Sequence, residues 1–223
     1  MKPKRKFERI ESGVPGLDKL IQGGFIKGST ILVSGEAGAG KTTFCLQYLW
    51  EGLQKGEPGI YITLEETAEE IRQDALSYGW DLSEYEKKDM FLIIEKNMFE
   101  DPDIDFFEID KLNAKRLVID SISILSLMID NKAVTRNRIG NMLRSLKEKD
   151  VTTLLISESA GASDFSRLGI EEYIADAVIL LELNSEGKKA ERSLFVRKMR
   201  RTMHSENRHK IKITPDGMSV GVK

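Results

Sequence analysis

The chain has 223 residues, 40% of them hydrophobic, and its 34 lysines and arginines against 36 aspartates and glutamates give a formal net charge of −2. This length suits one large α/β domain with a substantial core, and the balanced charge excludes an overall attraction to nucleic acid or to an anionic membrane. Neither a secretory signal nor a membrane span of roughly 18 apolar residues is recognisable and there is one cysteine, so we expect a cytoplasmic protein.

Short β-branched runs alternate with segments of helical periodicity along most of the chain. Most runs are apolar on both faces, as expected for parallel strands covered by helices. The expected strands are Thr30–Ser34, Ile60–Leu64, Phe91–Glu95, Leu117–Ser121, Thr153–Ser157 and Ala177–Glu182. Between them, apolar stripes at helical spacing occupy Leu46–Leu53 and Ile139–Leu146, and Thr67 with Glu70 forms a capping box that begins another helix.

The pattern changes to hairpins in the last part of the chain. The expected strands are Arg192–Met199, His209–Thr214 and Met218–Val222, with turn signals at Ser185–Gly187 and Pro215–Gly217. We therefore predict a single α/β domain over residues 1–223, with a mostly parallel central sheet flanked by helices. Residues 1–29 lead into this core, and residues 185–223 add a C-terminal antiparallel β extension.

A glycine-rich stretch directly follows the first of these strands: Gly35-Glu36-Ala37-Gly38-Ala39-Gly40-Lys41-Thr42-Thr43. It matches G-x-x-x-x-G-K-[ST] between a strand and an amphipathic helix, which is the context that this P-loop pattern requires. Glycines let backbone N–H groups and the positive helix N-terminus converge on phosphates. We expect this stretch to bind ATP, with Lys41 reaching the β- and γ-phosphates and the Thr42 hydroxyl ligating Mg²⁺. The alternative is a glycine-rich turn without a ligand.

A buried apolar strand ends in an acid at Leu117-Val118-Ile119-Asp120. Asp120 is therefore the candidate for the second Mg²⁺ residue, paired with Thr42. An aspartate after an apolar run can instead cap a helix, although Ser121 could fill that role.

Two adjacent carboxylates, Glu65 and Glu66, follow the strand after the P-loop helix. The C-terminal edge of an open α/β sheet is where ligands bind. Because neighbouring residues of a strand point to opposite faces, we expect one of the two to face the γ-phosphate and to orient or deprotonate the attacking water. In the alternative, Glu66 begins a capped helix and Glu65 pairs with a surface lysine.

These motifs belong to an ordered series along the chain. The series comprises Ser12-Gly13-Val14-Pro15-Gly16-Leu17-Asp18, Gly23-Gly24, the P-loop, Glu65-Glu66-Thr67, Ile119-Asp120-Ser121, Lys198-Met199-Arg200 and His204. Together they resemble the KaiC family of RecA-superfamily ATPases, named for a cyanobacterial clock protein. The resemblance covers Ser12 to Val220 and implies a RecA-like P-loop fold. It also implies an ATP site at each subunit boundary of a hexameric ring, where Lys198, Arg200 and His204 reach a neighbour's nucleotide.

Three departures from the family pattern change the expectations. The clock protein carries two such domains, whereas this chain has one P-loop and resembles the single-domain, archaeal-type members. Where the clock protein has an adjacent Ser-Thr pair, this chain has Gly169–Asp176 without serine or threonine, so autophosphorylation there is not expected. Arg201 stands where the family usually has glycine, and we expect the loop toward His204 to differ.

The basic C-terminal stretch supports a second hypothesis. From Glu186 to Lys210, nine lysines and arginines stand against three glutamates and could contact nucleic-acid phosphates. The loops after Ser121 and Ser157 offer few cations and one aromatic residue, Phe165. We therefore favour a regulatory switch that acts on a signalling partner. A recombination- or helicase-type DNA-dependent ATPase and a nucleotide-binding scaffold without hydrolysis remain the alternatives.

Overall fold

A nine-stranded sheet forms the centre of the part of the chain that this computed structural model describes, residues 7–98, 107–124, 131–159, 166, 169–184 and 190–221. The parallel strands are β3 (Thr30–Gly35), β4 (Gly59–Thr63), β5 (Phe91–Glu95), β6 (Arg116–Asp120), β7 (Thr152–Glu158) and β8 (Ala177–Asn184). The antiparallel strands β9 (Glu191–Met199), β10 (Arg208–Thr214) and β11 (Gly217–Val220) extend the sheet. The strand order is β11-β10-β9-β8-β3-β7-β6-β4-β5, and this confirms the predicted class.

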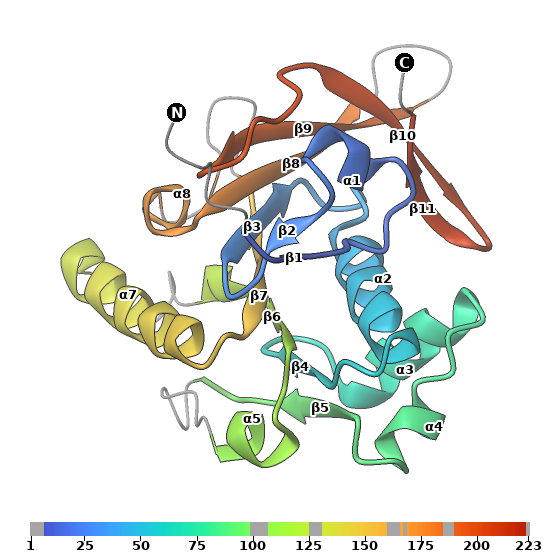
Figure 1. Cartoon of the computed structure of the whole chain (residues 1–223), viewed down its shortest axis with the longest axis vertical. Coiled ribbons are helices and arrows are strands. Elements are labelled where there is room, and N and C mark those ends of the chain that lie inside the picture. The colour runs from blue at the N-terminus through green and yellow to red at the C-terminus, as the bar shows by residue number, and fades with distance from the viewer. Residues whose placement is uncertain are drawn as a thin grey trace.

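Helices cover both faces of the sheet (Figure 1). Helices α2 (Lys41–Gln54), α3 (Ala68–Ser77) and α4 (Ser83–Glu86) pack on one face, and α5 (Phe107–Leu112) and α7 (Lys132–Glu148) pack on the other. Strand β3 shows why both faces are apolar, because Ile31 and Val33 pack in the core beneath α2 while Leu32 packs in the core beneath α7. The capping box is confirmed at α3, where the Thr67 N–H donates to Glu70 Oε2 at 2.8 Å.

Short elements complete the described chain. These are β1 (Arg9–Ile10), α1 (Leu17–Leu20), β2 (Phe25–Ile26), the single 3₁₀ turn Ile122–Ile124 and α8 (Glu171–Ile174). Strands β1 and β2 pair antiparallel beside the main sheet. The described strand ends lie within two residues of the predicted ones, and the predicted turn Ser185–Gly187 lies outside the described residues.

A buried arginine ties the P-loop helix to the sheet. Arg116 begins β6 and is 0% exposed. Its Nε donates to Glu57 Oε2 at 2.6 Å, and its Nη1 donates to the carbonyl oxygens of Tyr48 and Glu11 at 2.7 and 3.0 Å. A Cβ added to Gly52 of α2 would lie 2.3 Å from Arg116 Cδ, so the helix has glycine where the guanidinium passes. Strand β6 and helix α2 are thereby held at a fixed separation.

The parallel register sets which residues meet. Gly35 at the end of β3 pairs with Glu158 of β7 and Leu181 of β8, and Thr63 at the end of β4 pairs with Asp120 of β6. The P-loop, Asp120 and the turn after β4 therefore share the C-terminal edge of the parallel strands.

Candidate active site

Glycines shape the loop between β3 and α2. Gly38 and Gly40 have φ angles of 77° and 100°, in the left-handed region that side chains disfavour. Gly35 is needed for a different reason, because a Cβ there would lie 2.2 Å from the carbonyl oxygen of Leu181 on β8. The loop can therefore lie against β8 and present its backbone to a phosphate chain.

Lys41 begins α2 and lies across this loop. Its Nζ donates to the carbonyl oxygens of Gly35 and Glu36 at 2.9 and 3.0 Å. Burial lowers the pKa of Lys41, and the nearby carboxylates of Asp120 and Glu158 oppose that shift. The ammonium group is thus bound by neutral acceptors, which an anionic phosphate could replace.

Asp120 is the partly buried carboxylate at the centre of the site. The Tyr61 hydroxyl donates to its Oδ2. Burial raises the pKa of Asp120 to about 6, the charge of Glu65 raises it too, and hydrogen bonds from Tyr61 and Thr42 together with the charge of Lys41 oppose the shift. The structure therefore brings Thr42 and Asp120 together, as the P-loop pattern predicts.

Glu65 and Glu66 lie past the end of β4, and strand alternation does not apply to them. The Thr63 hydroxyl closes a turn by donating to the Glu66 carbonyl oxygen at 2.7 Å and accepting from the Glu66 N–H at 3.0 Å. The expectation that the pair would point to opposite faces of a strand is therefore wrong, because both residues lie in a turn and both side chains are exposed.

The two carboxylates have different surroundings within this turn. Ser121 Oγ donates to Glu65 Oε1 at 3.3 Å. Although the Glu66 residue is exposed, partial desolvation of its carboxylate raises its pKa, and the charge of Asp120 adds to the shift. Both glutamates therefore lie near Asp120, at the edge where the γ-phosphate is expected.

A cavity of about 420 Å³ opens beside the loop. Its lining residues are Gly38, Gly40, Lys41, Thr42, Thr43, Tyr78, Arg192 and Ile213. Arg192 Nε donates to the Gly38 carbonyl oxygen at 3.0 Å, and the Thr43 and Tyr78 hydroxyls are 3.0 Å apart. The volume lies in the range of small-ligand sites. Sequence reasoning missed Tyr78, because no motif marks it and only the packing of α3 brings it to the P-loop.

The residues available for a metal are oxygen donors. In the described ranges, no group of three or more His, Cys, Asp or Glu side chains is arranged to hold a metal by itself. Mg²⁺ is commonly held by one or two protein oxygens together with substrate phosphates. The Thr42 hydroxyl beside the partly buried Asp120 carboxylate fits that mode, since a cation there would offset the cost of desolvating the charge.

Lys198 and Arg200, hereafter the finger pair, lie at the opposite edge of the sheet. Met199 pairs with Ala177 at the start of β8, whereas Gly35 pairs with Leu181, four residues further along. At ~3.3 Å per residue the finger pair is separated from the loop by roughly 13 Å or more along the strands. The structure does not bring these residues to the P-loop of their own chain.

Both members of the finger pair face the end of α8. Lys198 Nζ donates to the carbonyl oxygens of Glu172 and Ala175 at 2.8 and 2.7 Å. Arg200 Nη2 donates to the Tyr173 carbonyl oxygen at 3.2 Å. Burial lowers the pKa of Lys198, and the charge of Arg200 adds to this effect.

The loop after β9 carries the remaining predicted residue, His204. Its Nδ1 lies 3.0 Å from the Ser205 carbonyl oxygen, and the structure does not bring it to the P-loop. Arg201 has a φ angle of 59°, a backbone conformation that favours glycine, although an arginine stands there. The expectation that this loop differs from that of the family stays a prediction.

Asp120→Asn is expected to stabilise the ATP-free protein. Because the folded pKa of about 6 exceeds the ordinary 3.8, the wild type loses stability as pH rises through this interval, by at most about 3 kcal/mol at ~1.36 kcal/mol per unit. Urea unfolding near pH 8 should show the variant to be more stable, with a smaller difference near pH 4. The control is Asp216→Asn in the exposed β10–β11 turn, which should change little. A variant no more stable than wild type near pH 8 would contradict the claim that the charged Asp120 carboxylate lowers the stability of the folded protein.

No helix in the described part of the chain is long and apolar enough to cross a bilayer.

The chain matches the family described as the KaiC ATPase over residues 10–105 and 106–223. A UPF0273 protein of Pyrococcus horikoshii is 37% identical over 233 residues, covering 95% of this chain and 93% of the relative. The circadian clock oscillator protein KaiC of Parathermosynechococcus lividus is 32% identical, covering 97% of this chain but 43% of that protein.

A solved structure agrees with the sequence relatives. The crystal structure of a KaiC-like protein from Pyrococcus horikoshii superposes with a TM-score of 0.88 at 39% identity, covering 97% of this chain and 100% of that chain. The chain therefore belongs to the KaiC ATPase family and has its RecA-type, P-loop nucleotide-binding fold.

Proposed function

We propose that this protein hydrolyses the β–γ bond of ATP with Mg²⁺ and acts as a KaiC-like regulatory switch. One observation carries the proposal: Lys41, Thr42 and the two glutamates gather around the partly buried carboxylate of Asp120 at one sheet edge. A merely structural aspartate would not need a neighbouring P-loop lysine and threonine together with two exposed carboxylates.

In this proposal each of these side chains has a role. Lys41 exchanges the carbonyl oxygens of Gly35 and Glu36 for phosphate oxygens and neutralises their charge. Thr42 and Asp120 would hold Mg²⁺, which supplies charge neutralisation at the phosphates when bound. Glu65 or Glu66 accepts the proton of the attacking water. Glu66 is the stronger candidate, because its pKa is raised in the direction that favours a general base at neutral pH.

Replacing both glutamates, Glu65→Gln with Glu66→Gln, should preserve ATP binding and lower turnover by at least about 10²-fold, the usual effect of losing a positioned base. A fluorescent ATP analogue measures binding, and phosphate release measures turnover. The single variants then divide the roles, with the larger loss expected for Glu66→Gln. If the double variant turns over ATP within a few-fold of wild type, the pair is structural.

The finger pair completes the site from a neighbouring subunit in this proposal. It lies at the far end of the strands from its own P-loop, so it can act on ATP only when a second copy presents its P-loop edge. The family implies the same arrangement in a hexameric ring. An arginine supplied in trans is typically worth about 10³ to 10⁵ in rate, far more than a solvated cation.

Mixing inactive proteins tests the shared site. Arg200→Ala and Lys41→Ala should each be nearly inactive alone, because one lacks the finger and the other the P-loop cation. Mixed oligomers should recover ATP turnover where an intact P-loop meets an intact finger. Gel filtration with ATP and Mg²⁺ follows assembly and subunit exchange. A mixture that exchanges subunits without regaining activity would refute the proposal that the site is shared.

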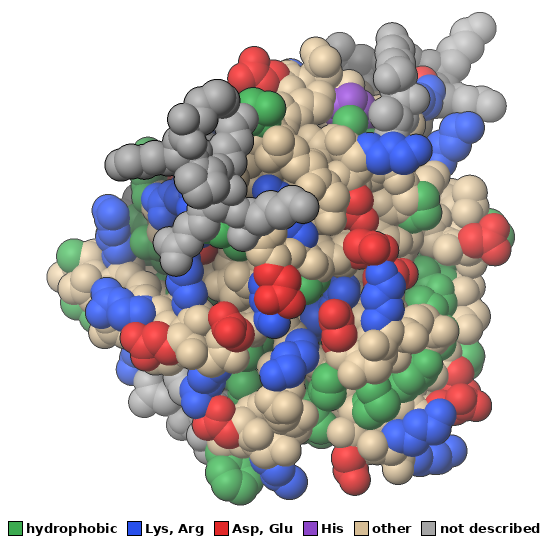
Figure 2. Space-filling model, in the orientation of Figure 1, with side chains coloured by type: hydrophobic (Ala, Val, Ile, Leu, Met, Phe, Trp, Pro, Cys, Tyr) green, Lys and Arg blue, Asp and Glu red, His purple; other side chains and the backbone are tan. Residues whose placement is uncertain are grey.

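A DNA-dependent ATPase is the second candidate function, suggested by the basic C-terminal stretch. Its described cations already have protein partners: Arg208 pairs with Glu182 at 2.8 Å, Lys210 with Glu191 at 2.5 Å and Arg201 with Asp176 at 3.3 Å. Figure 2 shows basic side chains interrupted by acidic ones on the face in view. Phe165 and most of the loops after Ser121 and Ser157 lie outside the described residues.

Steady-state ATP turnover with and without single-stranded DNA separates the three hypotheses. We expect a small rate that DNA does not stimulate, with little DNA binding at physiological salt, because contacts to the phosphate backbone weaken steeply as salt rises. A rate that rises several-fold with DNA would establish the recombination- or helicase-type function. No turnover under any condition would leave the nucleotide-binding scaffold.

A further inference from the structure

Asp176 is a buried carboxylate between α8 and β8, at the same edge as the finger pair. The residue is 7% exposed. Its N–H donates to the Thr30 carbonyl oxygen at 2.8 Å, and its Oδ2 accepts from the Thr30 N–H at 3.3 Å. Two hydrogen bonds thus fix Asp176 to the first residue of β3, the strand that ends in the P-loop.

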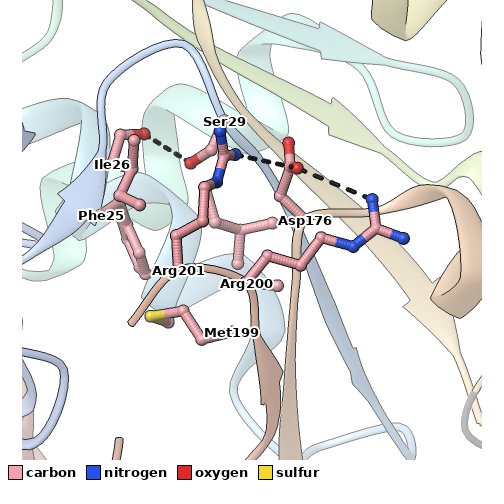
Figure 3. Close-up of a pocket in the computed structure, with 9 residues that line it drawn as sticks. Phe25, Ile26, Ser29, Asp176, Met199, Arg200 and Arg201 are labelled. Atoms are coloured by element: carbon pink, nitrogen blue, oxygen red, sulfur yellow. Dashed lines mark hydrogen bonds and ion pairs between the residues drawn. The ribbon is translucent and has the colours of Figure 1, made fainter. Parts of the chain in front are cut away.

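Asp176 also holds the turn that follows β9. Its carbonyl oxygen accepts from the Arg200 N–H at 2.9 Å, and its Oδ1 accepts from Arg201 Nη2 at 3.3 Å. Arg200 Nη1 lies 3.9 Å from the same oxygen. Figure 3 shows the two guanidinium groups on either side of the carboxylate. The main chain of the turn is therefore fixed by a hydrogen bond to Asp176, while the Arg200 side chain makes only a long ion-pair contact with its carboxylate.

The small space beside Asp176 offers no room for a ligand. Phe25, Ile26 and Met199 line a cavity of about 10 Å³ together with Asp176 and the two arginines. That volume is about the minimum for one water molecule. The burial of the Asp176 carboxylate is therefore explained by its bonds to the start of β3 and to the turn after β9, and not by a bound ligand.

Three cations share this carboxylate, since Lys147 of α7 donates from Nζ to Oδ2 at 3.0 Å. Lys147 and Arg201 make the closer contacts, and the Arg200 side chain is 51% exposed with the longest separation. Arg200 can therefore leave Asp176 for an anion, while Arg201 and Lys147 continue to neutralise the carboxylate.

We propose that Asp176 is the positioning residue for the finger pair: it fixes the turn after β9 through Arg201 and the Arg200 N–H, so that Arg200 extends toward the ATP of a neighbouring subunit. This inference rests on the proposed function. It also gives Arg201 a role, because the arginine occupies a glycine-favouring conformation and its side chain bonds to Asp176. A preorganised turn spares the entropy of ordering Arg200 during each reaction.

In the mixed-oligomer assay, a substitution of Asp176 can be placed either in the subunit that supplies the P-loop or in the subunit that supplies the finger pair. In a mixture of Arg200→Ala and Lys41→Ala subunits, the first supplies the P-loop and the second supplies the finger. Asp176→Asn keeps an oxygen for the Thr30 N–H and removes the charge. When Asp176→Asn is in the finger-supplying subunit, we expect the recovered rate to fall about tenfold with an unchanged KM for ATP. When it is in the P-loop-supplying subunit, we expect the recovered rate to stay within about twofold of that of the parent mixture.

Matched variants separate positioning from folding. Arg201→Gly suits the φ angle of 59°, keeps the fold and should reproduce the one-sided loss. Lys149→Ala removes a cation two residues from Lys147 that pairs with Asp110 rather than with Asp176, and it should leave the recovered rate unchanged in either subunit. Thermal unfolding of each variant checks the fold.

Other outcomes would overturn the inference. An equal loss from Asp176→Asn in both subunits, a gain in the finger-supplying subunit, or an Arg201→Gly variant without effect would show that the carboxylate does not position Arg200. A parent mixture that never recovers activity fails at an earlier step, because it overturns the shared site of the proposed function and the positioning role with it.

Discussion

Parallel pairing of β3, β4, β6 and β7 is the constraint on which the site depends. It places Gly35, Asp120 and the turn after Thr63 at one edge, although they are far apart in sequence. Helix α2 then begins at that edge, and buried Arg116 holds it against β6. A shift in register by one residue would move each side chain to the opposite face of the sheet, disrupt the packing of both cores and separate the site residues.

The same arrangement partly removes the Asp120 carboxylate from water. Burial raises the pKa of Asp120 to about 6, so the folded protein bears a cost for its charge at neutral pH. The hydrophobic cores on the two faces of the sheet supply enough stability to offset the free-energy cost of charging Asp120. The same cost favours the binding of a cation at Asp120. Natural sites often give up stability for function in this way.

Local motifs predicted the strands, the P-loop and Asp120, because each depends on a short run of residues in a fixed strand or helix context. The sequence was less informative where a single side chain changes the backbone. Thr63 ends β4 early and puts Glu65 and Glu66 in a turn. Tyr78 and Asp176 escaped notice because their roles arise from elements that only the fold brings together.

Lys41 and Lys198 stand in the same chemical situation at opposite edges of the sheet. Burial lowers the pKa of each, and each is held by two backbone carbonyl oxygens. A cation paired with a carboxylate would have to break an ion pair before binding phosphate, and much of the gain would be lost. Carbonyl acceptors hold the ammonium in place at a smaller cost. Both ammonium groups can thus donate to a phosphate oxygen. Under the proposed function, Lys41 donates to its own subunit's ATP and Lys198 to a neighbour's.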